Sequence, residues 1–365
     1  MRLKSKYCST FLCLSLVALM SSCSATRYLS SGEYMLSGVE VKSDNKLVDP
    51  ANLSPYVRQK PNSKWFSMFK VPLFIYSFSG KDTTKWVNRT IKHLGEAPVV
   101  FDTLLADRSA RDMLMAMQNM GFIHSSVSLD TREHGKKLKA IYTLHPGTPF
   151  YIGNVDMEVL DEAIDTIAEV HKTSLRKGDV FTVSGLDEER KRITRLLTNR
   201  GYYRFHKDFI QFEADTTSLS NIVDLHMRLL PYRASATSSE TAHPRYLIDT
   251  VMVTSAIPDH AVGLRPSVLR DNIALKAHQP FSAEQLTATY NNLARLSAVK
   301  YANVRFNEAS DTLLLSADVA VDTSHPSSIS FQPEGTNTAG DLGAAALLTY
   351  QNRNLFRGSE VLSIQ

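Results

Sequence analysis

Cysteine is scarce in this chain of 365 residues, which has only three. Cys8 and Cys13 lie inside an N-terminal segment typical of an export signal, so the exported chain would keep Cys23 alone. A single thiol has no partner for a disulfide within the chain, and the domains must rely on apolar cores. Hydrophobic residues make up 43% of the sequence, which is adequate for such cores, and the length predicts two to four domains.

An excess of one charge is also missing. Lys and Arg total 41 against 37 for Asp and Glu, which gives a net charge of +4. The basic residues are spread along the chain, without an arginine-rich arm or a basic run interleaved with aromatics. This pattern argues against nucleic acid as a partner.

Catalytic motifs are absent as well. The chain has no G-x-S-x-G, P-loop, G-x-G-x-x-G or H-E-x-x-H, and its eleven His residues lack metal-ligand spacing. We interpret the acidic residues 187–189 as a helix start, where carboxylates favour the helix dipole. Residues 206–208 are interpreted as the solvated face of a strand. The sequence therefore predicts a protein that is not an enzyme and has no cofactor and no metal site.

The N-terminus has a clear pattern. Basic "MRLKSKY" is followed by about ten apolar residues, too few to span a bilayer, and then by "SSC". This arrangement resembles a bacterial lipobox, with Met20 where Leu is usual. We expect a signal peptide over residues 1–22, acylation of Cys23 (palmitate being one such acyl group) and a tether over 23–33. An ordinary secretory signal with a coincidental cysteine is the alternative.

Three segments share a β-α-α-β-β plan. In residues 150–232, strand-like "YIGNVDMEV" and apolar-periodic "LDEAIDTIAEV" precede a helix, "SGLDEERKRITRLLTNRGYY", and two alternating runs. Gly201 stands where a helix C-cap is expected. One face of that helix is apolar, with Leu186, Ile193, Leu196 and Leu197.

The plan recurs over residues 34–149 and 244–322, and a polar stretch at 233–243 predicts a linker. Gly121-Phe122 and Gly201-Tyr202 both follow a helix, whereas the third segment has Ala298-Val299 there. The first segment also contains an aromatic insertion, which we interpret as additional core. The alternative is an exposed surface for membrane or partner contact, formed by Trp65, Phe66, Phe69, Phe74 and Tyr76.

A helix that ends in Gly-aromatic before two strands, repeated behind an export signal, resembles the polypeptide-transport-associated (POTRA) domain. The C-terminal stretch resembles the opening of the β-barrel in the BamA/TamA family of outer-membrane proteins, where an EGTN-(small)-G-(polar)-LG turn precedes a strand ending NLFRGAE. The signal, "SATRYLSSGEYML" and "RQKPNSKWFSMFKVPLFIY" resemble its lipoprotein form in Bacteroidetes-type bacteria. The residues of the barrel-start motif are Glu334, Gly335, Thr336, Asn337, Gly343, Asn354, Leu355, Phe356, Arg357, Gly358 and Glu360.

The resemblance implies an α+β fold, with tandem β-α-α-β-β POTRA-like domains followed by the first strands of a truncated outer-membrane β-barrel over 323–365. By resemblance, the strand within 342–351 would be the gate strand that pairs with an incoming strand. Even the smallest transmembrane barrel has eight strands, so we expect a fragment or a truncated gene product. Its C-terminal part should be a loose hairpin, disordered, or docked on the third repeat.

The resemblance also implies a role in outer-membrane protein assembly or translocation. The expected partners are unfolded outer-membrane protein clients, outer-membrane lipid, and partner lipoproteins or periplasmic proteins. A β-α-α-β-β unit leaves a sheet edge open, to which a client strand can add through backbone hydrogen bonds. We expect a lipid-anchored protein of the cell outer membrane whose repeats face the periplasm. The alternative is a freestanding periplasmic lipoprotein adaptor made only of the repeats.

Overall fold

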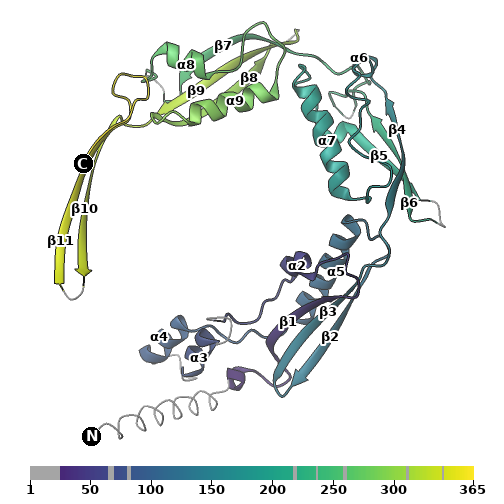
Figure 1. Cartoon of the computed structure of the whole chain (residues 1–365), viewed down its shortest axis with the longest axis vertical. Helices are drawn as coiled ribbons and strands as arrows, with labels where there is room; N and C mark the ends of the chain where they lie inside the picture. Colours follow the sequence, from purple (N-terminus) through teal and green to yellow (C-terminus); the bar gives the residue numbers. More distant parts are fainter. Residues whose placement is uncertain are drawn as a thin grey trace. The chain divides into compact units, whose positions relative to one another are not determined.

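The computed structural model describes residues 25–64, 70–79, 84–216, 220–235, 237–257, 261–309, 312–338 and 341–365. The chain divides into two compact units. The first runs up to Ile152 and includes Gly178–Ser184 and Thr216–Val223, and the second holds the remainder. Figure 1 shows three small sheets with their helices, followed by a hairpin.

The first domain is built on the sheet β1-β3-β2. Strand β3 (Lys137–His145) lies in the middle, parallel to β1 (Met35–Ser43) and antiparallel to β2 (Ser126–His134). Helix α5 (Thr103–Asn119) packs on this sheet and is capped by Asp102, whose carboxylate accepts the N–H groups of Leu104 and Leu105. The connection from β1 to α5 holds α2 (Pro50–Leu53), η2 (Ser54–Tyr56), α3 (Val71–Ser77) and α4 (Trp86–Leu94), and η1 (Ala25–Tyr28) precedes β1.

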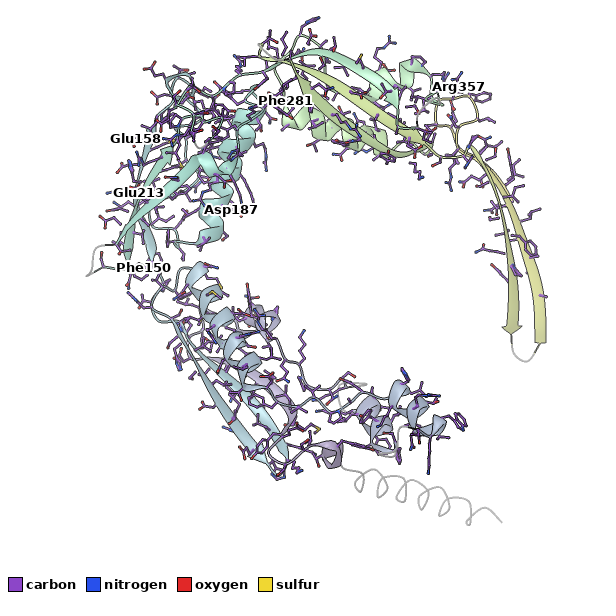
Figure 2. All side chains as sticks on the ribbon, turned by 180° about the vertical axis from the view of Figure 1, so that it is seen from behind. Phe150, Glu158, Asp187, Glu213, Phe281 and Arg357 are labelled. Carbon is purple, nitrogen blue, oxygen red and sulfur yellow. The ribbon has the colours of Figure 1, made fainter. Side chains whose placement is uncertain are left out.

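The second domain has the strand order β4-β6-β5. Arg228 on the middle strand shows this order through its ion pairs, at 2.9 Å to Glu158 on β4 and 3.5 Å to Glu213 on β5. Figure 2 labels the two glutamates. In α7, Ile193 and Leu197 are fully buried, as the apolar face predicts. The elements are β4 (Tyr151–Val159), α6 (Glu162–Asp165), α7 (Val183–Thr198), η3 (Lys207–Phe209), β5 (Ile210–Thr216) and β6 (Ile222–Leu229).

The third domain repeats the sheet of the first. Strand β9 (Leu314–Thr323) lies between parallel β7 (Leu247–Ser255) and antiparallel β8 (Val299–Glu308). Helices α8 (Pro266–Asn272) and α9 (Ala283–Ala294) cover one face. A separate sheet follows, in the order β10-β11-β12, with β10 (Ser327–Thr338), β11 (Asp341–Asn352) and β12 (Leu362–Ile364).

The predicted fold class is therefore confirmed, because β-α-α-β-β recurs three times on separate three-stranded sheets, with α3 and α4 inserted between α2 and α5 of the first domain. Two local interpretations were wrong. Residues 206–208 lie at a 3-10 turn rather than in a strand, because β5 begins only at Ile210. Residues 187–189 are not in the first turn of their helix, because α7 already begins at Val183.

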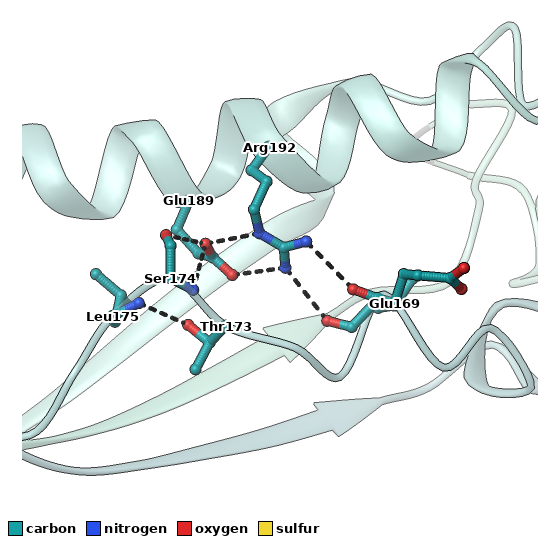
Figure 3. A network of polar contacts seen from close by, with 7 residues as sticks. Glu169, Thr173, Ser174, Leu175, Glu189 and Arg192 are labelled. Carbon is teal, nitrogen blue, oxygen red and sulfur yellow. Dashed lines mark hydrogen bonds and ion pairs between the residues drawn. The ribbon is translucent and has the colours of Figure 1, made fainter.

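Glu189 shows what the acidic residues do instead. Its fully buried carboxylate accepts hydrogen bonds from Ser174 (N and Oγ) and from Arg192 at 2.8–2.9 Å (Figure 3). Burial by itself would raise the pKa of Glu189, but the bonds from Arg192 and Ser174 outweigh it and lower that pKa. Arg192 also donates to the carbonyl oxygens of Glu169 and Val170, so the network holds the loop before α7 against the helix.

Candidate functional site: sheet edges and the 353–360 segment

Each domain sheet has two edge strands, and one of them is partly covered. The covered edges belong to β1, β4 and β7. Near the start of each of these strands, the segment that precedes α5, α7 or α9 pairs with it. Its carbonyl oxygens at Val99, Asp179 and Gln279 accept the N–H groups of Leu36, Ile152 and Ile248, each at 2.8 Å. The opposite edges belong to β2, β5 and β8. The same pairing thus occurs at the same place in all three domains.

Strand β8 is the longest of these opposite edges, with ten residues. Lys300, Tyr301 and Arg305 are exposed on it, and Tyr301 is 51% accessible. Edge strands β2 and β5 are mostly polar and exposed in the same way. Such edges can accept an extended chain through backbone groups, with little demand on its sequence.

The resemblance gives residues 334–343 as a turn before a strand, and in the structure the first four of them lie in β10, which ends at Thr338, while β11 begins at Asp341. Glu334 and Gly335 belong to β10, where they face Ala345 and Ala344 of β11. Thr336 faces Gly343, and Asn337 faces Leu342. The continuous register with β11 explains the difference, because each residue from Ser327 to Thr338 has a partner there.

The predicted gate strand within 342–351 lies in β11. This strand is in the middle of its sheet, whereas a strand that pairs with an incoming strand would lie at an open edge. It pairs with β10 along its whole length and with β12 at Tyr350, Gln351 and Asn352. The edge strand is β10. Pro333 lies in it, which suits an edge because proline has no N–H to donate to a second neighbour.

The second half of the motif, residues 353–360, forms a loop docked on the third domain. Asn354 donates to the carbonyl oxygen of Gly263 at 2.9 Å, and the N–H of Arg265 donates to that of Arg357 at 2.8 Å. The guanidinium of Arg265 pairs with Glu360 at 2.9 Å. Of the three expected states of the C-terminal part, the structure has a hairpin that is docked through this loop.

Gly358 lies directly against this ion pair, and a larger residue there would have to displace the ends of its two flexible side chains. A Cβ there would lie 2.2 Å from the Glu360 carboxylate and 2.3 Å from the Arg265 guanidinium. The carboxylate also accepts N–H groups at Phe356 and Gly358, and bonds from backbone N–H groups lower the pKa of Glu360. Leu355 and Phe356 are themselves exposed.

Sequence reasoning missed the partners of this loop. They are Gly263, Arg265 and Ala298, whose N–H donates to the Ser359 hydroxyl at 2.9 Å. One signal was present, since Ser359 stands where the family pattern NLFRGAE has alanine.

Other predicted residues have varied outcomes. Cys23, Trp65, Phe66 and Phe69 lie outside the described residues. Phe74 and Tyr76 are half-buried in α3, where the ring of Tyr76 lies 5.3 Å from that of Tyr28. Their packing favours the core interpretation for these two residues.

In the part of the chain that the structure describes, no group of three or more His, Cys, Asp or Glu side chains could hold a metal ion. None of the described helices is long and apolar enough to cross a membrane.

No family model and no curated protein matches the chain. Solved structures with similar folds include POTRA domains 3–5 of BamA from Haemophilus influenzae, at 11% identity and a TM-score of 0.41, covering 81% of this chain and 99% of that one. BamA from Haemophilus ducreyi, lacking POTRA domains 1–3, gives 13% and 0.43, covering 59% of this chain and 36% of that one. CdiB from Acinetobacter baumannii gives 11% and 0.31, covering 72% and 45%. Strand order and register, rather than these likenesses, define the domain fold.

Proposed function

We propose that this chain acts in the assembly or translocation of outer-membrane proteins. Its three domains would face the periplasm and bind unfolded client or partner polypeptides by strand addition. The observation that supports this is the repeated edge, since each sheet places β2, β5 or β8 at its border. An edge offers backbone donors and acceptors at a spacing that any extended chain can match, although on β8 the N–H of Val304 already donates to the Tyr290 hydroxyl at 3.0 Å.

We further propose that β10 and β11 are the first strands of a membrane barrel that inserts clients. Each has twelve residues, and about 9–11 are enough to cross a bilayer. Their register places Phe331 opposite Leu348 and Ile329 opposite Tyr350, which gathers apolar side chains on one face. Ile329 and Phe331 are 72% and 64% exposed to water, and insertion into lipid would remove this exposure. The edge that would meet an incoming strand is then that of β10.

Photo-crosslinking tests the strand-addition part. A photoreactive amino acid replaces one exposed edge residue at a time, Thr131 on β2, Gln211 on β5 or Tyr301 on β8, and the probe is a urea-unfolded outer-membrane β-barrel protein diluted into buffer. Met115 on helix α5 is the matched control, at 53% exposure against 51% for Tyr301. We expect crosslinks from at least one edge and not from Met115. Equal yields at the helix and the edges would contradict strand addition.

Hydrogen exchange tests the hairpin part. Residues 342–351 should exchange far faster than the domain sheets in water, because only β10 and the end of β12 pair with β11. Detergent should slow their exchange. Strong protection in water, in a monomer, would mean that the hairpin completes a domain of its own, which favours the freestanding adaptor.

A further inference from the structure

Helix α4 (Trp86–Leu94) has two sharply different faces. At 100° per residue, Trp86, Val87 and Leu94 share an arc with Thr90 and Ile91, and the remaining residues are Asn88, Arg89, Lys92 and His93. The helix contains no Asp or Glu, and Lys85 precedes it. Its charge is therefore entirely basic, and all of that charge lies on one side.

The apolar face of α4 is exposed rather than packed. Trp86 is 71% exposed and Leu94 is 69% exposed, whereas Ile91 is half-buried. Trp86 is larger than any other side chain on the helix and contributes most to this surface. An amphipathic helix of a folded domain normally turns this face to the core.

The position of α4 in the chain indicates what covers this face. Gly95, just after α4, lies so close to α3 that a Cβ there would be 2.5 Å from the amide nitrogen of Tyr76. The ring of Tyr76 in turn contacts Tyr28, whose hydroxyl donates to the carbonyl oxygen of Ser79. Figure 1 shows α3 and α4 side by side.

Tyr28 is only five residues beyond Cys23. Five residues span at most about 18 Å when fully extended. An acyl group on Cys23 would therefore keep Tyr28, and α3 and α4 with it, near the membrane surface. This step rests on the predicted acylation, whereas the two faces of α4 do not.

We propose that α4 lies flat on a phospholipid membrane carrying anionic headgroups. Trp86, Val87 and Leu94 enter the boundary between headgroups and acyl chains, and exposed Arg89 contacts phosphate and other anionic groups. Lys92 is half-buried on the far side of the helix and adds only electrostatic attraction to the anionic surface. A short helix with a basic face, an apolar face bearing Trp and Leu, and low overall hydrophobicity is suited to this interfacial position. The contact would orient the first domain against the membrane that holds its lipid anchor.

The experiment uses the chain from Cys23 to Gln365 with Cys23→Ser, so that binding does not depend on acylation. Trp65→Phe leaves Trp86 as the single tryptophan, because the chain has only two. The probes are phosphatidylcholine vesicles with and without phosphatidylglycerol. We expect Trp86 emission to shift to shorter wavelength with anionic vesicles and to be quenched by brominated acyl chains. An unshifted, unquenched Trp86 at saturating lipid overturns the proposal.

Charge variants sharpen the test. Arg89→Glu/Lys92→Glu should weaken partitioning onto anionic vesicles at least about 25-fold, at about fivefold for each basic residue. Arg270→Glu/Lys276→Glu, exposed in the third domain, changes the net charge equally and should leave Trp86 quenching unchanged. Equal effects of the two pairs, or equal binding to neutral vesicles, would overturn the proposal. Because Trp86 reports only on its own surroundings, these outcomes are independent of client binding and of the exposed hairpin.

Discussion

At the ends of α5, α7 and α9, the chain that follows each sheet comes back to bind the helix end, and we call this contact a joint. The joints at α5 and α7 are similar, and the joint at α9 is different. Gly121 and Gly201 follow the first two helices with φ angles of 95° and 104°. Their carbonyl oxygens accept the N–H groups of Phe150 at 2.9 Å and Tyr246 at 2.7 Å, each of which precedes the next domain's first strand. In both joints, an aromatic residue of the chain that follows the sheet therefore hydrogen-bonds to the glycine at the helix end.

At the third helix end, the matching residue is Ala298, which is buried. Its carbonyl oxygen accepts the N–H of Ser324 at 2.8 Å, so the returning chain is still bound, but no aromatic residue is placed there. The N–H of Ala298 donates to Ser359 in the docked loop. The position thus serves the hairpin and its loop instead of a following domain.

The difference explains why glycine is required in two joints and alanine is accepted in the third. A Cβ on Gly121 would lie 2.3 Å from the carbonyl oxygen of Phe181. The N–H of Phe181 in turn donates to the carbonyl oxygen of Phe150. A Cβ on Gly201 would lie 2.9 Å from the flexible side chain of Arg245 and 3.1 Å from the Tyr246 carbonyl oxygen. Close backbone approach at a positive φ therefore accompanies each joint to a further domain.

Gly121→Ala should have the largest effect in the joints. The left-handed conformation costs about 1–2 kcal/mol for alanine, and the clash with a backbone oxygen forces a shift worth about 1–3 kcal/mol more. We expect about 4 kcal/mol of destabilisation in the first domain and about 2 kcal/mol for Gly201→Ala in the second. Hydrogen exchange in increasing urea measures both, domain by domain. Ala298→Gly is the control, with a loss of about 1 kcal/mol or less. Equal losses for all three would end the distinction between the joints.

Asp161→Asn should disrupt a set of buried hydrogen bonds at the second joint. One carboxylate oxygen of Asp161 caps α6 by accepting from Ala163 and Ile164, and the other accepts the N–H and Nδ1–H of His243 at 2.6 and 2.9 Å. Both side chains are buried, so the substitution leaves a donor unpaired in the interior. We expect a loss of about 3 kcal/mol, read from the exchange of residues 241–246. An unchanged first domain is the internal control.

The same residues predict a pH dependence that separates the joints. Burial lowers the pKa of His243 below its ordinary 6.5, although Asp161 acts to raise it, and His206 lowers it slightly more. Below 6.5 the unfolded chain binds a proton that the folded chain does not, so acid favours unfolding. The contribution of His243 to the free energy of unfolding should be fully present above pH 6.5. It should decline as the pH falls below that value, until His243 is itself protonated in the folded chain. Asp161→Asn should steepen this decline, because it removes the attraction that raises the pKa.

These features differ in how far the sequence could predict them. The apolar face of α7 and the cap at Gly201 depend on residues within a few turns, and periodicity was sufficient for both. The strand position of the EGTN residues could not be predicted in this way, because it is defined by the register with β11, not by local turn chemistry. The partners of the docked loop lie 61 to 95 residues away in the chain, beyond the reach of any local pattern.

Glu308→Gln should affect only the second joint, and by less. Glu308 accepts from Arg204 at 2.6 and 3.1 Å and from the Tyr246 hydroxyl at 2.9 Å. Burial and this carboxylate raise the pKa of Tyr246 to about 12. In the first joint, the residue that matches Arg204 is His124, whose ring packs on Phe150.

Since the side chains of Glu308 and Arg204 are 30% and 42% exposed, solvent screens their attraction. We expect a loss of about 1 kcal/mol, which added salt reduces. A salt-independent loss, or a similar loss in the first domain, would show that the ion pair is not specific to this joint.

Ser359→Ala should have the smallest effect and should be confined to the third helix end. The substitution removes the acceptor of the Ala298 N–H, which lies beside the buried core of that domain. An unpaired N–H at this half-exposed contact costs about 1 kcal/mol, so its hydrogen exchange should become about fivefold faster. Ser363→Ala on exposed β12 is the matched control and should leave Ala298 unchanged. The amides of residues 342–348 should also be unaffected, because β10 alone pairs with them. If they accelerate together with Ala298, the loop and the hairpin form one cooperative unit, and the third joint couples to the hairpin as closely as the other two couple to a domain.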